Sequence, residues 1–208
     1  MMQRKIRQNT KEALIRAAER LFAEKGLGTV SVRDITRAAG ARNESALHYH
    51  FGGVEALIRE VFANRYRDIE EARLARLAEF DAAGKNGDIQ AVMEVSVGPL
   101  FQACSDENGR LYAHFLAQLV TDPRFDLAEL VEDFAPSCVL PIADRALAAL
   151  GDLPAETVRA RLRQSFTISI ILTADYVRRI DAGDAPPVDE AVREAAACLA
   201  GFLRAMPG

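Results

Sequence analysis

A group of polar side chains in the first quarter of the chain has the residue types that read base edges in a DNA groove. Arg42 is suited to guanine and Asn43 to adenine, and either can instead contact a phosphate. Glu44 can accept a hydrogen bond from the amino group of cytosine, although it can equally cap the start of a helix. Ser45 and His48 project from one helix face, one turn apart, so both can reach bases.

Two short helices around a glycine turn are needed to hold those side chains outward, and the sequence predicts them. Ser31 caps a helix over 32–39, with Asp34 placed as the acid of a capping box. Gly40 ends this helix, and a second one is expected over about 43–51 with its apolar side packed inward. The pattern is that of a helix-turn-helix, although a plain helical hairpin would show the same apolar faces.

Helical periodicity continues through the rest of the chain. A helix from Asn9 or Thr10 to Lys25 precedes the pair, and a long one follows from 54 to about 80. Further helices are expected over 88–104, 110–121, 125–150 (interrupted near two prolines), 155–180 and 188–206. The prediction is an all-α fold of about nine helices. We divide it into a three-helix helix-turn-helix DNA-binding domain, residues 1–53, and a helical ligand-binding and dimerisation domain, residues 54–208.

The net charge of −4 hides a difference between the two parts. Residues 1–51 hold ten Lys and Arg against five Asp and Glu, a net charge of +5, whereas the remainder carries −9. A basic N-terminal part on an acidic body indicates that this part alone meets a polyanion such as DNA. A solvated basic face would give the same charges, so the local pattern has to decide.

Motifs of catalysis, metal binding and membrane insertion are missing from the sequence. Three well-separated cysteines, in no paired spacing, indicate reduced residues of a cytoplasmic protein. There is no glycine-rich nucleotide loop, no serine-hydrolase elbow and no zinc-ligand spacing, and His48 and His50 do not share a helix face. We therefore expect no enzyme, no cofactor, no metal site and no membrane segment, and a cytoplasmic location.

Two stretches of the N-terminal part resemble the DNA-binding domain of TetR-family transcriptional regulators. The first is GLGTVSVRDITRAAG, residues 26–40, and the second is ALHYHFGGVEAL, residues 46–57. The resemblance covers about residues 8–60, while the rest of the chain agrees only in its number of helices. It implies an all-helical homodimer that binds a double-stranded DNA operator, usually as a repressor released by a small molecule.

The resemblance also implies contacts to phosphates. Tyr49 and His50 match positions that touch phosphates in the family, with support from Ser31. Further phosphate contacts are expected from a flexible N-terminal arm that carries Arg4, Lys5 and Arg7.

Three departures from the family pattern bear on these contacts. Val30 stands where a Thr is frequent, and Val54 stands where a Lys commonly starts the fourth helix, so two phosphate contacts are lost. The turn over 40–46 is one residue longer than the commonest form. This extra residue can shift the register of the base contacts by one position.

Sparse polar groups on apolar helix faces are expected to line a ligand pocket in the second domain. His114, Gln118 and Thr173 are the polar candidates. The apolar candidates are Phe62, Tyr66, Met93, Val97, Phe101, Tyr112, Phe115, Phe134 and Phe166. Ordinary core packing would give the same side chains, so the pocket rests more on the resemblance than on any one residue.

The last two predicted helices are expected to form the dimer interface. Their outward positions carry more small and apolar residues than one core face requires: Ile168, Ile171, Leu172, Ala195, Ala196, Leu199, Phe202 and Leu203. Two helices from each subunit can close a four-helix interface with two-fold symmetry, which suits a palindromic operator. The alternative is that these helices only cover the ligand-binding domain.

These observations favour a DNA-binding transcriptional regulator, a repressor released by a small, largely apolar ligand. One alternative is a helical enzyme or carrier that uses the apolar pocket, and turnover by the purified protein would support it. The other is a helical adaptor whose basic part binds an acidic protein. Failure of DNA to compete at physiological salt would support the adaptor.

Overall fold

The computed structural model describes residues 2–41, 43–84, 87–134 and 136–205. Over these residues the chain forms ten helices and no strand, which confirms the predicted all-α fold. The helices are α1 (Met2–Lys25), α2 (Val32–Ala38), α3 (Ser45–Phe51), α4 (Val54–Ala82), α5 (Ile89–Ala103), α6 (Glu107–Leu119), α7 (Leu127–Phe134), α8 (Pro136–Ala149), α9 (Ala155–Ala182) and α10 (Val188–Arg204). Their number exceeds the expected nine because the region 125–150 divides into α7 and α8. None of the helices in the described part of the chain has the length and apolar character needed to cross a bilayer.

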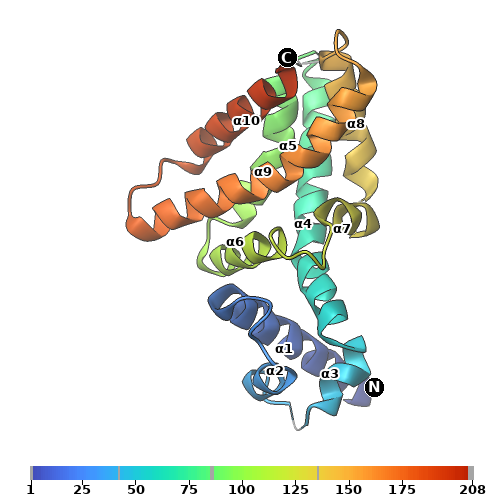
Figure 1. Ribbon diagram of the computed structural model, residues 1–208, viewed down its shortest axis with the longest axis vertical. Helices are drawn as coiled ribbons and strands as arrows, with labels where there is room; N and C mark the ends of the chain where they lie inside the picture. Colours follow the sequence, from blue (N-terminus) through green and yellow to red (C-terminus); the bar gives the residue numbers. More distant parts are fainter. Residues whose placement is uncertain (1, 42, 85–86, 135, 206–208) are drawn as a thin grey trace.

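Figure 1 shows two groups of helices joined by α4. The head, α1–α3, gathers at one end of the molecule around the first turns of α4, and the C-terminus lies at the opposite end. The body consists of α4–α10. In it α4 packs against α5 and α8, and α10 packs against both α5 and α9. α6 connects the two groups, because it packs against α1 of the head and α9 of the body.

The apolar stripe of α1 holds the head together. Leu14, Ala18 and Phe22 follow one another at a spacing of four and are fully buried. They share one core with Ile35 of α2 and Leu47 of α3, and this core continues into α4 and α6. The core therefore crosses the domain boundary expected after residue 53, and that boundary stays a prediction.

The start of α1 differs from the prediction. The helix begins at Met2 and not at Asn9 or Thr10. The first residues are good helix formers without Gly or Pro, so nothing in them stops the helix. As a correction, the backbone at Arg4, Lys5 and Arg7 belongs to this helix and not to a flexible arm.

The central helix of the body, α5, is enclosed on several sides. All residues from Val95 to Phe101 are buried, and α10 covers one side of this segment. Four positions expected to face a second subunit lie inside the protomer instead and are 5% exposed or less: Ala195, Ala196, Leu199 and Leu203. That expectation was wrong because an enclosed helix needs apolar cover from more neighbours than a surface helix does.

Candidate nucleic-acid interface

The first short helix of the head, α2, starts at a complete capping box. Ser31 Oγ accepts a hydrogen bond from the Asp34 N–H at 3.2 Å, and the Asp34 carboxylate accepts from the Ser31 N–H at 3.3 Å. The Ser31 hydroxyl also donates to that carboxylate at 2.5 Å. These hydrogen bonds favour the ionised carboxylate and hold the pKa of Asp34 below its usual value. The predicted capping box is confirmed.

The chain then turns at Gly40, which has a φ of +66°. This backbone conformation favours glycine because a Cβ would be strained there. Ala41 N–H donates to Thr36 O at 2.9 Å and Gly40 N–H donates to Arg37 O at 3.1 Å, the two bonds of a Schellman motif. The motif sets the direction in which the chain leaves α2. Arg42, the predicted guanine contact, lies outside the described residues.

The second short helix, α3, turns one face to the core and the other to solvent. Leu47 is fully buried, whereas Ser45, His48 and Tyr49 are exposed, Tyr49 to 66%. These exposed positions are three and four residues apart, so they form one outward stripe. The His48 ring is held near the helix end, with Nδ1 at 3.3 Å from Gly52 O. α3 thus presents polar and aromatic groups from a firmly packed base.

Asn43 and Glu44 precede α3 and do not form its first turn. Both side chains are exposed. Asn43 Oδ1 accepts a hydrogen bond from Ser45 Oγ at 2.6 Å, so the two side chains lie together at the leading end of the helix. Glu44 occupies the N-cap position without a capping hydrogen bond from its side chain. The alternative in which Glu44 caps the helix is therefore wrong.

The end of α3 is packed against α1. His50 is half-buried, with its ring edge-on to Tyr49 (centroids 5.1 Å apart) and 6.1 Å from the Phe51 ring. The ammonium of Lys11 in α1 lies 5.7 Å from the centroid of the Phe51 ring, a cation–π contact. This contact and the shared core keep α3 in a fixed position on the longer helix.

Two arginines of α2 are absent from the predicted set of contacts. Arg33 and Arg37 are exposed and one helical turn apart, and Ser31 is exposed at the start of the same helix. Guanidinium groups in this position add to the positive charge that phosphate binding requires. Both arginines stand at outward positions of a short amphipathic helix, and this periodicity could have identified them from the sequence.

Comparison with known proteins identifies the head. The profile for bacterial regulatory proteins of the tetR family matches residues 14–61, which include α2, the Gly40 turn and α3. The HTH-type transcriptional repressor KstR2 of Rhodococcus jostii (strain RHA1) is 32% identical to this chain over 124 residues. The head is thus a TetR-family DNA-binding domain. TetR proteins are transcriptional regulators and not enzymes, in agreement with the prediction. The matched stretch is 58% of this chain, and the chain spans 57% of the length of KstR2.

A likeness in fold to a solved structure extends over the body as well. The solved structure of FadR from Bacillus halodurans, described as a fatty acid degradation regulator, superposes with a TM-score of 0.64. The match covers 91% of this chain and 97% of FadR at 16% sequence identity. At this identity the likeness concerns the fold.

The apolar residues predicted to line a ligand pocket do not surround one cavity. Most belong to the core shared with the head, either as buried members or packed against it: Phe62, Tyr66, Tyr112, Phe115, Phe134 and Phe166. The others lie in a second core that includes α5 and α10: Met93, Val97 and Phe101. As a set of ligand contacts these residues stay a prediction.

The polar pocket candidates are engaged elsewhere. The buried Thr173 hydroxyl donates to Ser169 O of its own helix at 2.8 Å. His114 Nε2 lies 3.7 Å from Asp181 Oδ2 at the surface. Gln118 is exposed. The structure therefore does not bring these three side chains together.

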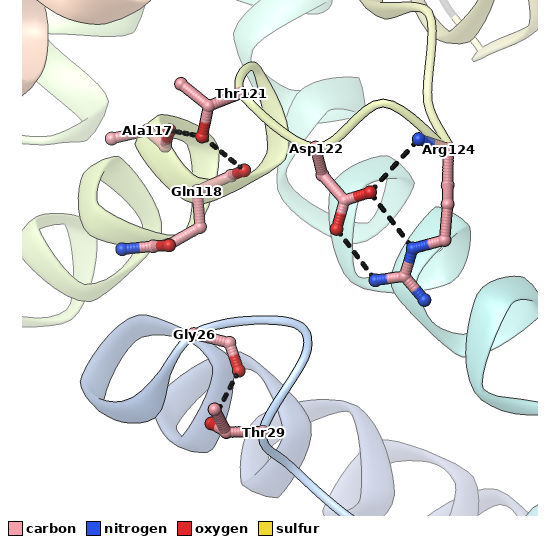
Figure 2. A network of polar contacts seen from close by, with 7 residues as sticks. All are labelled: Gly26, Thr29, Ala117, Gln118, Thr121, Asp122 and Arg124. Carbon is pink, nitrogen blue, oxygen red and sulfur yellow. Dashed lines mark hydrogen bonds and ion pairs between the residues drawn. The ribbon is translucent and has the colours of Figure 1, made fainter.

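Gln118 lies at the junction of head and body (Figure 2). It belongs to the last turn of α6, and a Cβ built on Gly26 at the end of α1 would lie 3.5 Å from its Oε1. Side-chain hydroxyls bond to backbone carbonyls on both sides of the junction, Thr29 to Gly26 at 3.2 Å and Thr121 to Gln118 at 3.1 Å. The end of α6 and the turn that follows α1 thus lie close together, and a hydroxyl–carbonyl hydrogen bond stabilises each of them.

An apolar groove of about 280 Å³ lies between α7, α8 and α9. Val131, Leu140 and Phe166 contribute one wall residue from each helix, and Leu140 is 70% exposed. Of the predicted pocket residues only Phe166 lines it. The groove forms where three helices meet, so periodicity along one helix could not locate it. Within the described ranges, no cluster of His, Cys, Asp or Glu side chains is arranged to hold a metal ion.

Proposed function

We propose that this chain is a transcriptional repressor that reads a DNA operator through α3. The observation that carries the proposal is the outward stripe of Ser45, His48 and Tyr49 on a short helix anchored by Leu47. A helix with such a stripe fits the major groove, where side chains at its leading end reach base edges. The description of KstR2 as a transcriptional repressor supports the sign of regulation. Such a protein acts in the cytoplasm, where a bacterial chromosome lies.

The side chains of the head divide into two roles. Base contacts are assigned to Asn43, Ser45 and His48, with Arg42 and Glu44 as further candidates at the start of the helix. Phosphate contacts are assigned to Ser31, Tyr49, His50, Arg4, Lys5 and Arg7. Base contacts set the sequence preference, whereas phosphate contacts strengthen binding to every sequence and make it sensitive to salt.

The outer side of α9 and α10 is the proposed homodimer interface. Ile171 is 46% exposed, and Ile168, Leu172 and Phe202 are half-buried, so these helices offer partly exposed apolar surface. Pairing the two helices with their symmetry mates gives a four-helix interface. A two-fold dimer places two α3 helices for a palindromic operator with half-sites about one helical turn apart.

Release from the operator is assigned to a small, largely apolar ligand. The groove between α7, α8 and α9 is a candidate entrance because its walls are mostly apolar. A ligand can favour a form of the dimer with misplaced α3 helices only by binding that form more tightly.

The proposal is tested by capture of random genomic fragments on the purified protein at about 0.15 M salt, an ionic strength that screens weak surface attraction. The double variant His48→Ala/Tyr49→Ala is the matched control, because both side chains are exposed and lie outside the hydrophobic core. We expect the natural protein to enrich a palindrome that the variant does not enrich. The absence of any enriched sequence, or the same enrichment by both proteins, would contradict reading of DNA by α3.

A further inference from the structure

The body contains a buried guanidinium group. Arg73 projects from α4 and is only 2% exposed. Its Nε donates to Ser96 O at 2.8 Å, and its Nη1 donates to Tyr66 Oη at 3.1 Å and to Cys138 Sγ at 3.5 Å. The guanidinium also lies over the Tyr66 ring, 5.4 Å from its centroid. None of these hydrogen-bond partners is a carboxylate.

No carboxylate within the described part of the chain lies within 4.0 Å of the Arg73 guanidinium. Glu70 lies one turn earlier on α4 and is also buried, but its carboxylate accepts a hydrogen bond from Ser137 N at 2.9 Å, at the start of α8. A buried cation is costly unless an anion is close to it, because water no longer solvates its charge. Arg73 therefore has the hydrogen bonds that position it, but no carboxylate of the described residues contacts it.

The space beside Arg73 continues toward the apolar groove. A void of about 10 Å³, close to the least that holds one water molecule, is bordered by Arg73 together with Tyr66, Ser96 and Ser169. Val131 and Phe166 line both this void and the groove between α7, α8 and α9. These two side chains are thus a shared wall between an apolar groove and a buried positive charge.

We propose that the groove and Arg73 together bind a small molecule with an apolar body and one carboxylate. The apolar body occupies the groove, and the carboxylate passes the Phe166 ring to accept a charge-assisted hydrogen bond from Arg73. Nη2 is the donor, because Nε and Nη1 already donate within the protein. A single guanidinium neutralises one negative charge, which matches a carboxylate better than a doubly charged phosphate. Because the void has room for about one water molecule, Val131 and Phe166 must move apart for the carboxylate to enter. The inference rests on the proposed function, since it gives the chemical class of the effector.

The opposite orientation of the ligand is less favourable. Arg159 and Arg163 line the groove and are exposed, and Arg163 already pairs with Glu132 at 3.4 Å, so a carboxylate there would gain little in water. The same orientation would also press an apolar chain against Arg73. The carboxylate is therefore assigned to the buried end.

The test is calorimetric titration of the full-length protein with decanoate and with decanamide, which has the same chain but no charge. We expect the natural protein to bind decanoate about tenfold or more tightly than decanamide, the effect of one charge-assisted hydrogen bond. Arg73→Met should remove this preference, whereas the control Arg163→Met should keep it. Equal binding of the two probes, or loss of the preference in the Arg163 variant alone, would overturn the proposal.

A second variant keeps the test decisive if Arg73→Met does not fold. Val139→Trp fills the groove from α8 and leaves Arg73 in place, so it should abolish decanoate binding. Unchanged binding by that variant would refute the site. Operator binding by the same preparations separates this inference from the proposed function. If the natural protein binds its operator but not decanoate, the proposed function stands and this ligand class is wrong. If it binds decanoate but no operator, the ligand class stands and the proposed function is wrong.

Discussion

Glu19 of α1 and Arg65 of α4 form an ion pair between head and body, with 2.5 Å between Oε1 and Nε. Glu19 is 5% exposed, and the Arg65 guanidinium lies over the ring of Tyr112 in α6, 5.9 Å from its centroid. Burial raises the pKa of Glu19, and the charge and hydrogen bond of Arg65 offset this only in part. Three helices meet at this pair, so a rotation of the head on the body must disturb it.

The raised pKa of Glu19 predicts how stability depends on pH. The folded protein takes up this proton at a higher pH than the unfolded chain, whose carboxyl has the ordinary value of 4.5. The folded state therefore gains stability from this group as the pH falls from neutral toward 4.5. Relative to Glu19→Gln, which cannot titrate, the natural protein should become more resistant to urea over that range. The assignment would be contradicted if the difference in unfolding free energy between the two proteins did not change with pH. It would also be contradicted if that difference changed only as much as it does for the exposed control Glu71→Gln.

Gly109 allows α6 to start close to the end of α5. A Cβ at this position would lie 1.9 Å from Ala103 O and 2.8 Å from the Cα of Cys104, both backbone atoms that cannot move away easily. Gly109→Ala should lower the free energy of unfolding by about 2 kcal/mol or more, the usual effect of overpacking a core. Gly28→Ala is the control, because no atom lies within 4 Å of its added Cβ, and it should change stability by less than about 0.5 kcal/mol. Urea unfolding of both variants measures the difference.

His48 and Arg7 should affect DNA binding in different ways. His48→Ala should relax the preference for one or two operator bases by about 1–3 kcal/mol and leave thermal stability unchanged, because the side chain is exposed. Arg7→Ala should weaken binding to all sequences equally and reduce its salt dependence. Titration of the selected operator and its single-base variants at several salt concentrations measures both effects. Parent-like binding by both variants to every sequence would refute the contact assignment.

Ile171 tests the proposed dimer surface. Ile171→Glu places a charge on a side chain that is 46% exposed, so the protomer should fold while the dimer weakens. Sedimentation should show monomers at concentrations where the natural protein is dimeric, and operator affinity should fall with it. Leu140→Glu is the control, since Leu140 is 70% exposed on α8, away from the proposed interface. If Ile171→Glu stayed dimeric, α9 would not form the interface.

The sequence alone determined the local features of the head. The Ser31–Asp34 capping box, the stop at Gly40 and the inward position of Leu47 depend on residues within about one helical turn of each other. The all-helical fold followed from periodicity in the same way. The outward residues of α3 could be identified because the single buried position, Leu47, fixes which face of this short helix points to solvent.

Only the tertiary structure decided which face each long helix buries and where cavities lie. Leu199 and Leu203 face α5 and not a second subunit, because the enclosed α5 needs cover, and that need is invisible in α10 itself. Arg73 continues the inward stripe of Tyr66, Ile69 and Leu77 on α4, yet two of its three hydrogen-bond partners come from α5 and α8. Sequence periodicity reports the environment of one helix, whereas a groove, a buried charge or an ion pair between head and body depends on helices that are distant in the chain.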